Sequence, residues 1–325
     1  MKPAISVIMT CFNAAQYIRA AITSVLNQTY SNFELIIVDD GSTDGSPQII
    51  KSFNDSRIKN INLPKNYGQS YCTNIAADSS AGEYIALTDA DDIIVPERLE
   101  KQMDFLSRHS QYIATSGYIK IIDESAVFSK EQITEIEDWF NFKNTTRDDM
   151  LKNMFVKSTI AGALLFFNRQ TFYNLGGYNT AYKVSGDSDF KFRLLENGEI
   201  YKIPEILYYY RIHSNQISIS RQNLQSYYSS MSKIDHLIRY YLSKRNWKKI
   251  VVWGAGSGLN YFKEIFVIRQ VKIDEVIDSD PRKTGAEILN CAIRPVNEHK
   301  FSRANFYIVS VGIKELQNEI VKLVS

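Results

Sequence analysis

The segment FELIIVDD, residues 33–40, joins an unbroken apolar run to two aspartates. Four consecutive apolar residues, Leu35 to Val38, are typical of a central strand that is buried on both faces of a parallel sheet. Because ligands bind outside the carboxyl ends of such strands, Asp39 and Asp40 follow the strand at a place where a binding site is expected. The segment therefore predicts an open α/β sheet with acidic groups along one edge.

The flanking sequence continues the alternation of strands and helices. Residues 5–8 and 83–87 predict two more strands, whose polar ends are Thr10 and the run Thr88-Asp89-Ala90-Asp91-Asp92. Helix signals lie between and after the strands: apolar residues at helical spacing (Ile18, Ile22, Val25), the pair Ser46-Pro47, and Pro96 followed by Leu99, Met103 and Leu106. This order indicates a mostly parallel sheet that is covered by helices.

The chain of 325 residues is long enough for more than one domain. We interpret residues 1–215 as the nucleotide-binding α/β domain, in which residues 110–210 follow a less regular pattern. Residues 216–246 are interpreted as a helical connector, and residues 247–325 as a second, small α/β domain. The second domain is expected to end in a strand at 306–311 and a helix at 313–323.

Bulk properties exclude several classes of protein. A net charge of +2 gives no electrostatic reason to bind nucleic acid. Cys11, Cys72 and Cys291 are isolated, so neither a disulfide framework nor a zinc cluster is indicated, and a reduced cytoplasmic setting is expected. The amino terminus lacks a signal-peptide pattern, and no apolar run reaches the ~18 to 20 residues that cross a bilayer. Contact with a membrane would therefore be peripheral, from the cytoplasmic side.

Carboxylates gather at the predicted strand ends. Asp89, Asp91 and Asp92 follow one strand, while Asp39 and Asp40 follow another, and such crowding is unfavourable unless a cation or hydrogen-bond donors compensate. Oxygen ligands without nearby Cys or His favour Mg²⁺ or Mn²⁺, ions that also bind substrate phosphates. The alternative is that these aspartates are ordinary helix caps.

Four blocks of sequence resemble, in order and spacing, the family 2 glycosyltransferases. The blocks are residues 6–13 (SVIMTCFN), 24–30 (SVLNQTY), 33–44 (FELIIVDDGSTD) and 82–92 (GEYIALTDADD) with Pro96-Glu97-Arg98-Leu99 behind it. The resemblance covers about residues 4–215. It implies the GT-A fold and transfer of a sugar from a nucleotide diphosphate, with a uridine nucleotide favoured.

The resemblance also implies roles for the residues that would hold the nucleotide. Thr10 and Phe12 resemble the positions that flank the base, and Asp40, with Asp39 beside it, resembles the carboxylate that accepts a hydrogen bond from the base. The family often has an arginine where this chain has Thr73, so one cationic contact is absent or supplied elsewhere.

For the metal, the resemblance identifies Asp89 and Asp91 as the DxD pair. Asp91 is implied as the direct ligand, and Asp89 also reaches the ribose. Asp92 either joins them or caps the helix behind Pro96. His213, in the block Tyr210-Arg211-Ile212-His213, either contacts the diphosphate or the metal, or satisfies local backbone groups.

The segment Gly186-Asp187-Ser188-Asp189-Phe190 resembles the acidic motif that supplies the family's catalytic base. Asp187 is implied as the base in preference to Asp189, with a helix-capping role as the alternative. A carboxylate in this place removes the proton of an acceptor hydroxyl while the new bond forms. Attack from the face opposite the leaving nucleotide makes the implied reaction inverting.

The second domain carries an incomplete dinucleotide-binding pattern. Gly254-Ala255-Gly256-Ser257-Gly258 follows a predicted strand and Asp278 lies at a suitable distance, but Leu259 occupies the place of the third glycine. The segment resembles the Rossmann-like modules of polysaccharide-pathway enzymes. Either it binds a nucleotide or it serves packing and homo-oligomer formation, and the latter is favoured.

Together these features predict a metal-dependent inverting glycosyltransferase that acts on a glycan or lipid-linked acceptor in surface polysaccharide or glycoconjugate synthesis. Two alternatives are a noncatalytic sugar-nucleotide-binding protein and a nucleotidyltransferase that acts on a sugar phosphate. The latter normally has a glycine-rich, lysine-containing loop after the first strand, whereas residues 11–15 here read CFNAA.

Overall fold

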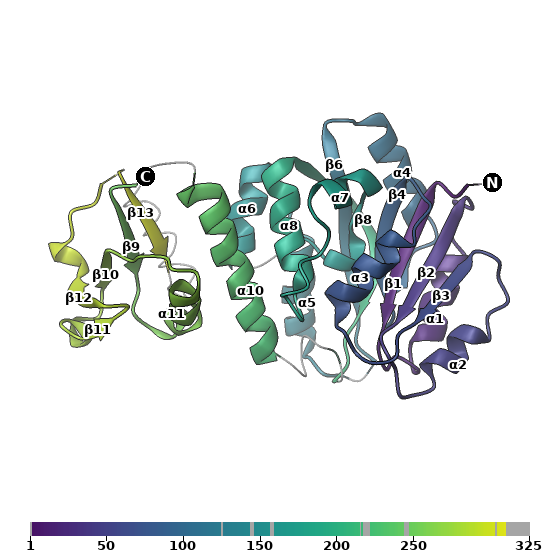
Figure 1. Cartoon of the computed structure of the whole chain (residues 1–325), viewed down its shortest axis with the longest axis horizontal. Helices are drawn as coiled ribbons and strands as arrows, with labels where there is room; N and C mark the ends of the chain where they lie inside the picture. The colour runs from purple at the N-terminus through teal and green to yellow at the C-terminus, as the bar shows by residue number, and fades with distance from the viewer. Residues whose placement is uncertain are drawn as a thin grey trace. The chain divides into compact units, whose positions relative to one another are not determined.

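The computed structural model describes residues 2–124, 126–143, 146–156, 159–214, 216, 222–243, 247–302 and 304–309. The chain divides into two compact units, Met1–Tyr228 and Ser229–Ser325 (Figure 1). The helix α10 (Gln222–His236) runs across this division. The domain limits expected from the sequence, at 215/216 and 246/247, stay predictions.

Unit 1 is built on an eight-stranded sheet with the order β3-β2-β1-β4-β7-β6-β8-β5. Its strands are β1 (Ile5–Cys11), β2 (Phe33–Asp39), β3 (Ile58–Asn62), β4 (Tyr84–Asp89), β5 (Ile93–Ile94), β6 (Tyr112–Ile122), β7 (Phe166–Asn168) and β8 (Glu199–Arg211). The strands β3, β2, β1 and β4 are parallel, β7 runs antiparallel to β4 and β6, and β6 is parallel to β8. The predicted mostly parallel sheet is confirmed.

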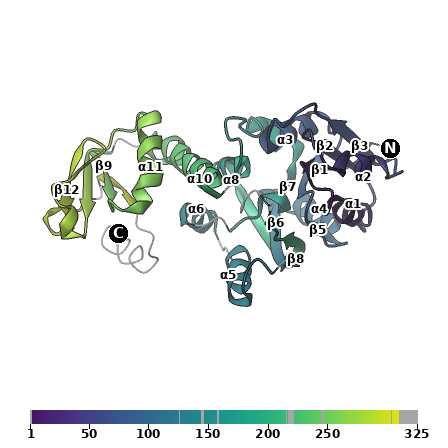
Figure 2. The same cartoon turned by 90° about the horizontal axis from the view of Figure 1, so that it is seen from below.

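Helices cover both faces of the parallel strands, as Figure 2 shows for α3 on one face and α1 and α4 on the other. The helices of unit 1 are α1 (Ile18–Leu26), α2 (Ser46–Lys51), α3 (Gln69–Asp78), α4 (Arg98–Arg108), α5 (Lys130–Phe140), α6 (Arg147–Val156), the 3₁₀ helix η1 (Gly162–Leu164), α7 (Arg169–Asn174) and α8 (Gly186–Asn197). Because both faces are covered, β1 and β2 are buried almost throughout, which explains their continuous apolar runs.

The helix α1 illustrates how the sequence pattern becomes packing. Its buried residues are Ile18, Ala21, Ile22 and Val25, which form one stripe at helical spacing. Each fully buried aliphatic side chain contributes about 1.5 to 3 kcal/mol to folding. The stripe therefore fixes α1 against the core and sets the loop between β1 and α1 at the edge of the sheet.

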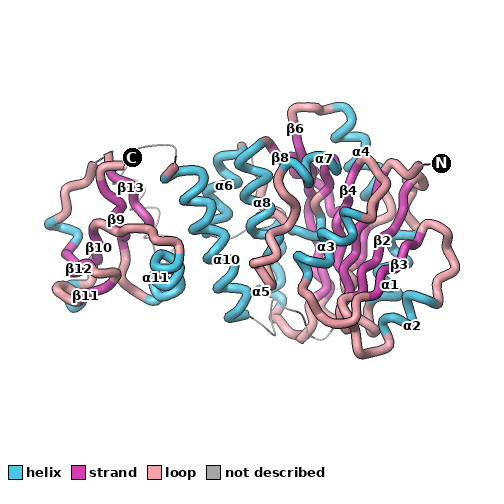
Figure 3. The backbone as a smooth tube through the Cα atoms, in the orientation of Figure 1, coloured by secondary structure: helices cyan, strands magenta, loops and turns pink. Residues whose placement is uncertain are grey.

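Unit 2 contains a five-stranded sheet with the order β11-β12-β10-β9-β13 (Figure 3, strands in magenta). Its elements are the π-helical turn η2 (Leu237–Leu242), β9 (Lys249–Trp253), α11 (Ser257–Ile268), β10 (Glu275–Asp278), the 3₁₀ turns η3 (Pro281–Lys283) and η4 (Val296–Glu298), β11 (Glu287–Ile288), β12 (Cys291–Pro295) and β13 (Asn305–Val309). The strands β12, β10, β9 and β13 are parallel to one another. The helix expected at 313–323 lies outside the described residues.

Within the described parts of the chain, every helix is too short or too polar to cross a lipid bilayer.

Candidate active site

The register of the parallel strands brings the predicted polar residues to one edge of the sheet. Thr10 lies opposite Asp89 of β4 on one side and Val38 of β2 on the other, and Cys11 lies opposite Asp39. Because β1, β2 and β4 end together, Thr10, Asp39 and Asp89 are neighbours along a single rim. Phe12 follows β1 at this rim and is 40% exposed.

Asp39, the last residue of β2, and Asp40 behind it are buried and hydrogen-bonded to nearby loops. Asp39 Oδ1 accepts a hydrogen bond from the Ser42 amide (3.2 Å). Asp40 accepts one bond on each carboxylate oxygen, from the amides of Tyr67 (2.7 Å) and Gly68 (2.9 Å). Asp40 therefore holds the loop that leads into α3.

This loop crosses so closely over the end of β2 that residue 41 has to be glycine. A Cβ on Gly41 would lie 2.6 Å from the backbone of Lys65, and the φ of Gly41 is +70°, a value that suits glycine. The close crossing places the Tyr67 and Gly68 amides within hydrogen-bond distance of Asp40.

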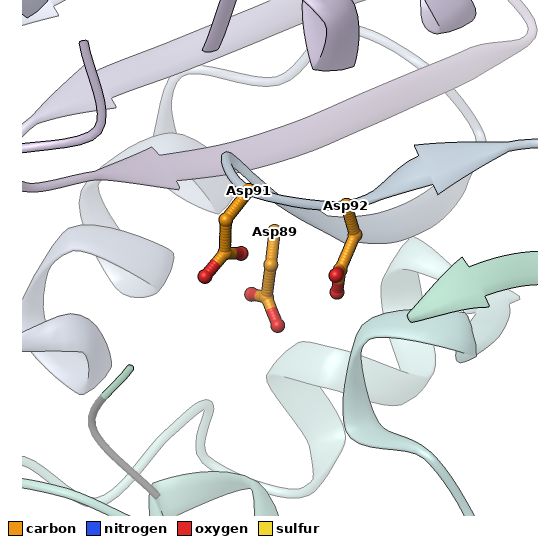
Figure 4. Close-up of side chains that lie close together, drawn as sticks. All are labelled: Asp89, Asp91 and Asp92. Carbon is orange, nitrogen blue, oxygen red and sulfur yellow. The ribbon is translucent and has the colours of Figure 1, made fainter. Parts of the chain in front are cut away.

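Three carboxylates after β4 form a cluster. Ligand atoms of Asp89, Asp91 and Asp92 lie within 4.8 Å of one another, and Figure 4 shows the three side chains side by side below the loop between β4 and β5. Asp91 Oδ2 is 3.0 Å from His213 Nε2. Asp92 Oδ1 accepts a hydrogen bond from the amide of Arg211 (2.6 Å), the last residue of β8, so the end of this strand fixes the position of the Asp92 side chain.

The raised pKa values of two carboxyl groups in this cluster indicate that a bound positive charge would be favourable. Burial, followed by the charges of Asp91 and Asp187, raises the pKa of Asp89 to about 7. Burial, followed by the charges of Asp91 and Asp89, raises the pKa of Asp92 well above its ordinary value, and its Oδ2 atom has no hydrogen-bond partner among the described residues. A divalent cation would remove this repulsion and use the free oxygen, so the residues fit a hard metal ion with oxygen ligands.

A buried arginine lies behind the cluster. Arg98 is fully buried, its Nη2 donates to the carbonyls of Leu87 (2.8 Å) and Ala163 (3.2 Å), and burial lowers its pKa to about 10. The hydroxyl of Tyr208, beside this guanidinium, accepts a hydrogen bond from the Asp89 amide (3.1 Å). Arg98 thus links the end of β4 to η1 from inside the protein. The sequence interpretation included Arg98 in a motif without assigning it a role.

The first turn of α8 presents Asp187 toward the acidic cluster, as the effect of its charge on Asp89 indicates. The Asp187 side chain is 30% exposed and its Oδ2 is 2.8 Å from Lys191 Nζ. Asp189 is only 2% exposed and is paired with Arg193. Of the two candidates for the base, Asp187 alone has solvent access.

The structure also locates the residues for which alternatives were open. Asp92 caps no helix: it binds the Arg211 amide, and α4 begins after Glu97 without a side-chain cap. His213 contacts the side chain of Asp91, and its ring packs on Tyr17 (4.4 Å between centroids).

The place of the missing arginine is taken by a neutral pair. Thr73 is buried and donates to the Gln69 carbonyl (2.9 Å), while Gln69 Nε2 donates to Asp89 Oδ1 (3.3 Å). Sequence interpretation missed both Gln69 and Lys191. Lys191 had a detectable signal, because it lies four residues after Asp187 on a predicted helix.

Comparisons with known sequences agree with this geometry. The sequence model described as "Glycosyl transferase family 2" matches residues 6–175. An uncharacterized glycosyltransferase of Haemophilus influenzae is 32% identical over 257 residues, which cover 74% of this chain and 75% of that relative. The putative teichuronic acid biosynthesis glycosyltransferase TuaG of Bacillus subtilis is 32% identical over 225 residues, 68% of this chain and 83% of that relative.

Two solved structures share the fold. S. aureus TarS in complex with UDP-GlcNAc has a TM-score of 0.58 at 19% identity, with 73% of this chain and 67% of that chain covered. The mannosyltransferase PcManGT from Pyrobaculum calidifontis, in complex with GDP-Man and Mn²⁺, has a TM-score of 0.52 at 18% identity, with 83% and 69% covered. The predicted GT-A type of α/β fold is confirmed.

Proposed function

The chain belongs to glycosyl transferase family 2, and from this membership we propose that it is a metal-dependent, inverting enzyme that transfers a sugar from a UDP-sugar to a hydroxyl of a glycan or lipid-linked acceptor. That the protein is a glycosyltransferase that uses a nucleotide sugar follows from the family. The metal, the donor and the acceptor are the proposed part.

The acidic cluster is the observation that carries the proposal. Asp89, Asp91 and Asp92 meet where β1, β2 and β4 end, and burial and the charges of their neighbours raise the pKa values of Asp89 and Asp92. We propose Asp91 and Asp89 as ligands of Mn²⁺ or Mg²⁺, with Asp92 as a third oxygen donor. The ion would neutralise charge on the departing diphosphate.

The nucleotide would lie along the rim beside this cluster. Phe12 is the exposed aromatic side chain after β1, and Thr10 and Asp40 lie where the strands end, so they are proposed to contact the base. Asp39 positions Ser42 through its hydrogen bond and acts on the base indirectly. His213, beside Asp91, is proposed to contact the diphosphate.

Asp187 is proposed as the general base. Its carboxylate takes the proton of the acceptor hydroxyl while the hydroxyl oxygen bonds to the anomeric carbon, and the bond from that carbon to the nucleoside diphosphate breaks on the opposite face. The partial exposure of Asp187, and its proximity to the acidic cluster, support this role.

The names of similar proteins indicate which donors and acceptors to test. One similar structure contains UDP-GlcNAc and another GDP-Man with Mn²⁺, while one relative is assigned to teichuronic acid biosynthesis. We propose a uridine nucleotide and a polysaccharide or lipid-linked acceptor on this basis.

The proposed general base is tested with the variant Asp187→Asn. The amide keeps the size of the side chain but accepts no proton, so transfer is expected to fall by about 10² to 10⁴-fold while UDP binding stays within about twofold. Transfer from radiolabelled UDP-sugar and calorimetric UDP binding measure the two effects. Asp148→Asn is the control, because Asp148 is also the second residue of a helix but is exposed. Unchanged transfer in Asp187→Asn would refute the assignment.

The test of the metal is a thermal-shift panel. With Mn²⁺ present, UDP is expected to raise the melting temperature, because a ligand that binds the folded state stabilises it. EDTA should abolish both this shift and transfer. GDP and GDP-Man are included in the panel to determine whether the protein prefers a uridine or a guanosine nucleotide. Asp91→Asn should remove the dependence on Mn²⁺, and equal UDP binding with and without Mn²⁺ would contradict the proposal.

A further inference from the structure

The helix α8 carries two acid–base pairs with the same spacing. Asp187 pairs with Lys191 (2.8 Å) and Asp189 pairs with Arg193 (2.6 Å), each four residues apart. In the second pair the carboxylate is buried, as expected of a pair that serves packing. In the first pair the arrangement is reversed, because the lysine is 4% exposed and the carboxylate 30% exposed.

A buried ammonium next to a half-exposed carboxylate needs a physical reason. Removing the charge of a lysine from water costs several kcal/mol, and an apolar side chain of the same length would pack at lower cost. Lys191 Nζ has two described partners, Asp187 Oδ2 and the carbonyl of Ile160 (3.1 Å). Ile160 lies two residues before η1, so Lys191 joins the carboxylate to the segment that packs against it.

The same carboxylate oxygen is enclosed on its other side. A Cβ on Gly162, the first residue of η1, would lie 2.6 Å from Asp187 Oδ2 and 2.8 Å from its Cβ. Oδ2 is therefore held between Lys191 Nζ and the Gly162 backbone. Oδ1 receives no hydrogen bond from the described residues, so it is the oxygen left for another molecule.

We infer that Lys191 is a positioning residue for the base: its ammonium fixes Oδ2 of Asp187 beside Gly162 so that Oδ1 faces the acceptor hydroxyl. This inference rests on the proposed role of Asp187. It assigns Lys191 an effect on the rate of transfer at saturating substrates, with none on donor binding, because Lys191 is buried and its described partners are Asp187 and the Ile160 carbonyl.

The test compares Lys191→Met, Lys191→Arg and Lys202→Met in the full chain. Lys191→Met keeps the length of the side chain without its charge, and Lys191→Arg keeps a cation. Lys202→Met is the matched control, since Lys202 is also a buried lysine, but its hydrogen bonds within the described part of the chain go to the carbonyls of Phe140, Phe142 and Thr159. Transfer is measured at saturating donor and acceptor and divided by the number of UDP-binding sites, which corrects for unfolded protein.

Lys191→Met is expected to lower kcat about 10- to 100-fold, the effect of a misplaced catalytic group, with the KM for donor within about twofold. Lys191→Arg should recover most of the rate, and Lys202→Met should keep kcat per site within about twofold of the unchanged protein.

Two results would overturn the inference: a normal kcat in Lys191→Met, or equal losses in Lys191→Arg and Lys191→Met. If Lys191→Met does not fold, Lys191→Gln, which keeps a hydrogen-bond donor without the charge, must show the same loss, and failure of both to bind UDP would show a purely structural role. Normal transfer by Asp187→Asn would instead refute the proposed base, so the two failures are distinguishable.

Discussion

Gly162 occupies a position where only a hydrogen atom fits. Because a methyl group there would lie within 3 Å of Asp187, Gly162→Ala is expected to displace that carboxylate and to lower transfer at least about tenfold. Donor binding should change little, since the atoms that an added Cβ would meet belong to Asp187, the proposed general base. Steady-state kinetics with UDP-binding calorimetry measure this difference.

Gly45→Ala is the control for Gly162→Ala. The φ of Gly45 is −73° and an added Cβ would meet only the Ala15 methyl at 3.7 Å, an ordinary contact. Equal losses of activity in the two variants would show that the effect comes from the substitution in general and would contradict the crowding at Asp187.

At the scale of residues, the sequence predicted the groups that lie on local motifs. Asp40, Asp89, Asp91 and Asp187 belong to such motifs. Their partners depend on tertiary contacts: the Tyr208 hydroxyl reaches the Asp89 amide across 119 positions of sequence. No local pattern encodes a contact of that kind, so the residues that surround Asp89 could be identified only from the structure.

Among the elements, β8 holds the end of α5 through one buried lysine. Lys202 donates to the carbonyls of Phe142 (3.0 Å) and Thr159 (2.8 Å) as well as to that of Phe140. Lys202→Met removes these hydrogen bonds, so the free energy of unfolding is expected to fall by about 1 to 3 kcal/mol at pH 9. Urea denaturation measures the change, with the exposed Lys51→Met as control.

The loss should depend on pH. Burial lowers the pKa of Lys202 to about 7, below the ordinary value of about 10.4 that applies to the unfolded chain. Between these values the unfolded chain binds a proton that the folded protein does not, so the contribution of Lys202 to stability rises with pH. The difference between unchanged protein and Lys202→Met should therefore be smaller at pH 6 than at pH 9. A difference that shrinks as the pH rises would contradict this assignment.

The strands β1, β2 and β4 were predicted because they are buried on both faces and read as apolar runs. The long strands β6 and β8 were not, because buried and exposed positions are mixed along them and their pairing is interrupted by register shifts. A strand of this kind has no simple period, and its position follows from its neighbours in the sheet.

For the whole molecule, the division into two units predicts two unfolding transitions in calorimetry. UDP with Mn²⁺ should raise the temperature of only one of them, because the rim and the match to the family both lie in unit 1. Arg269→Ala should lower the other transition, since Arg269 makes a bidentate pair with Asp235 inside unit 2. One shared transition that moves in both experiments would contradict independent units.

Unit 2 offers little for a nucleotide at its glycine-rich turn. Asp278 accepts hydrogen bonds from the Ala255 amide (2.6 Å), the Asp280 amide (2.7 Å) and Lys283 Nζ (2.9 Å). Three of the roughly four acceptor positions of this carboxylate are already used within the protein, which leaves about one for a ribose hydroxyl. We therefore propose a role in packing or assembly for unit 2.

Asp40 joins two tasks in one carboxyl group, because it anchors the loop before α3 and stands where the base is proposed to bind. A substitution of Asp40 that alters nucleotide preference would also release the loop, and a change in the loop would move the carboxylate that is proposed to bind the nucleobase. Donor selectivity and the order of the loop are therefore expected to change together. A switch to another nucleotide would require coordinated substitutions at Asp40 and in the loop before α3.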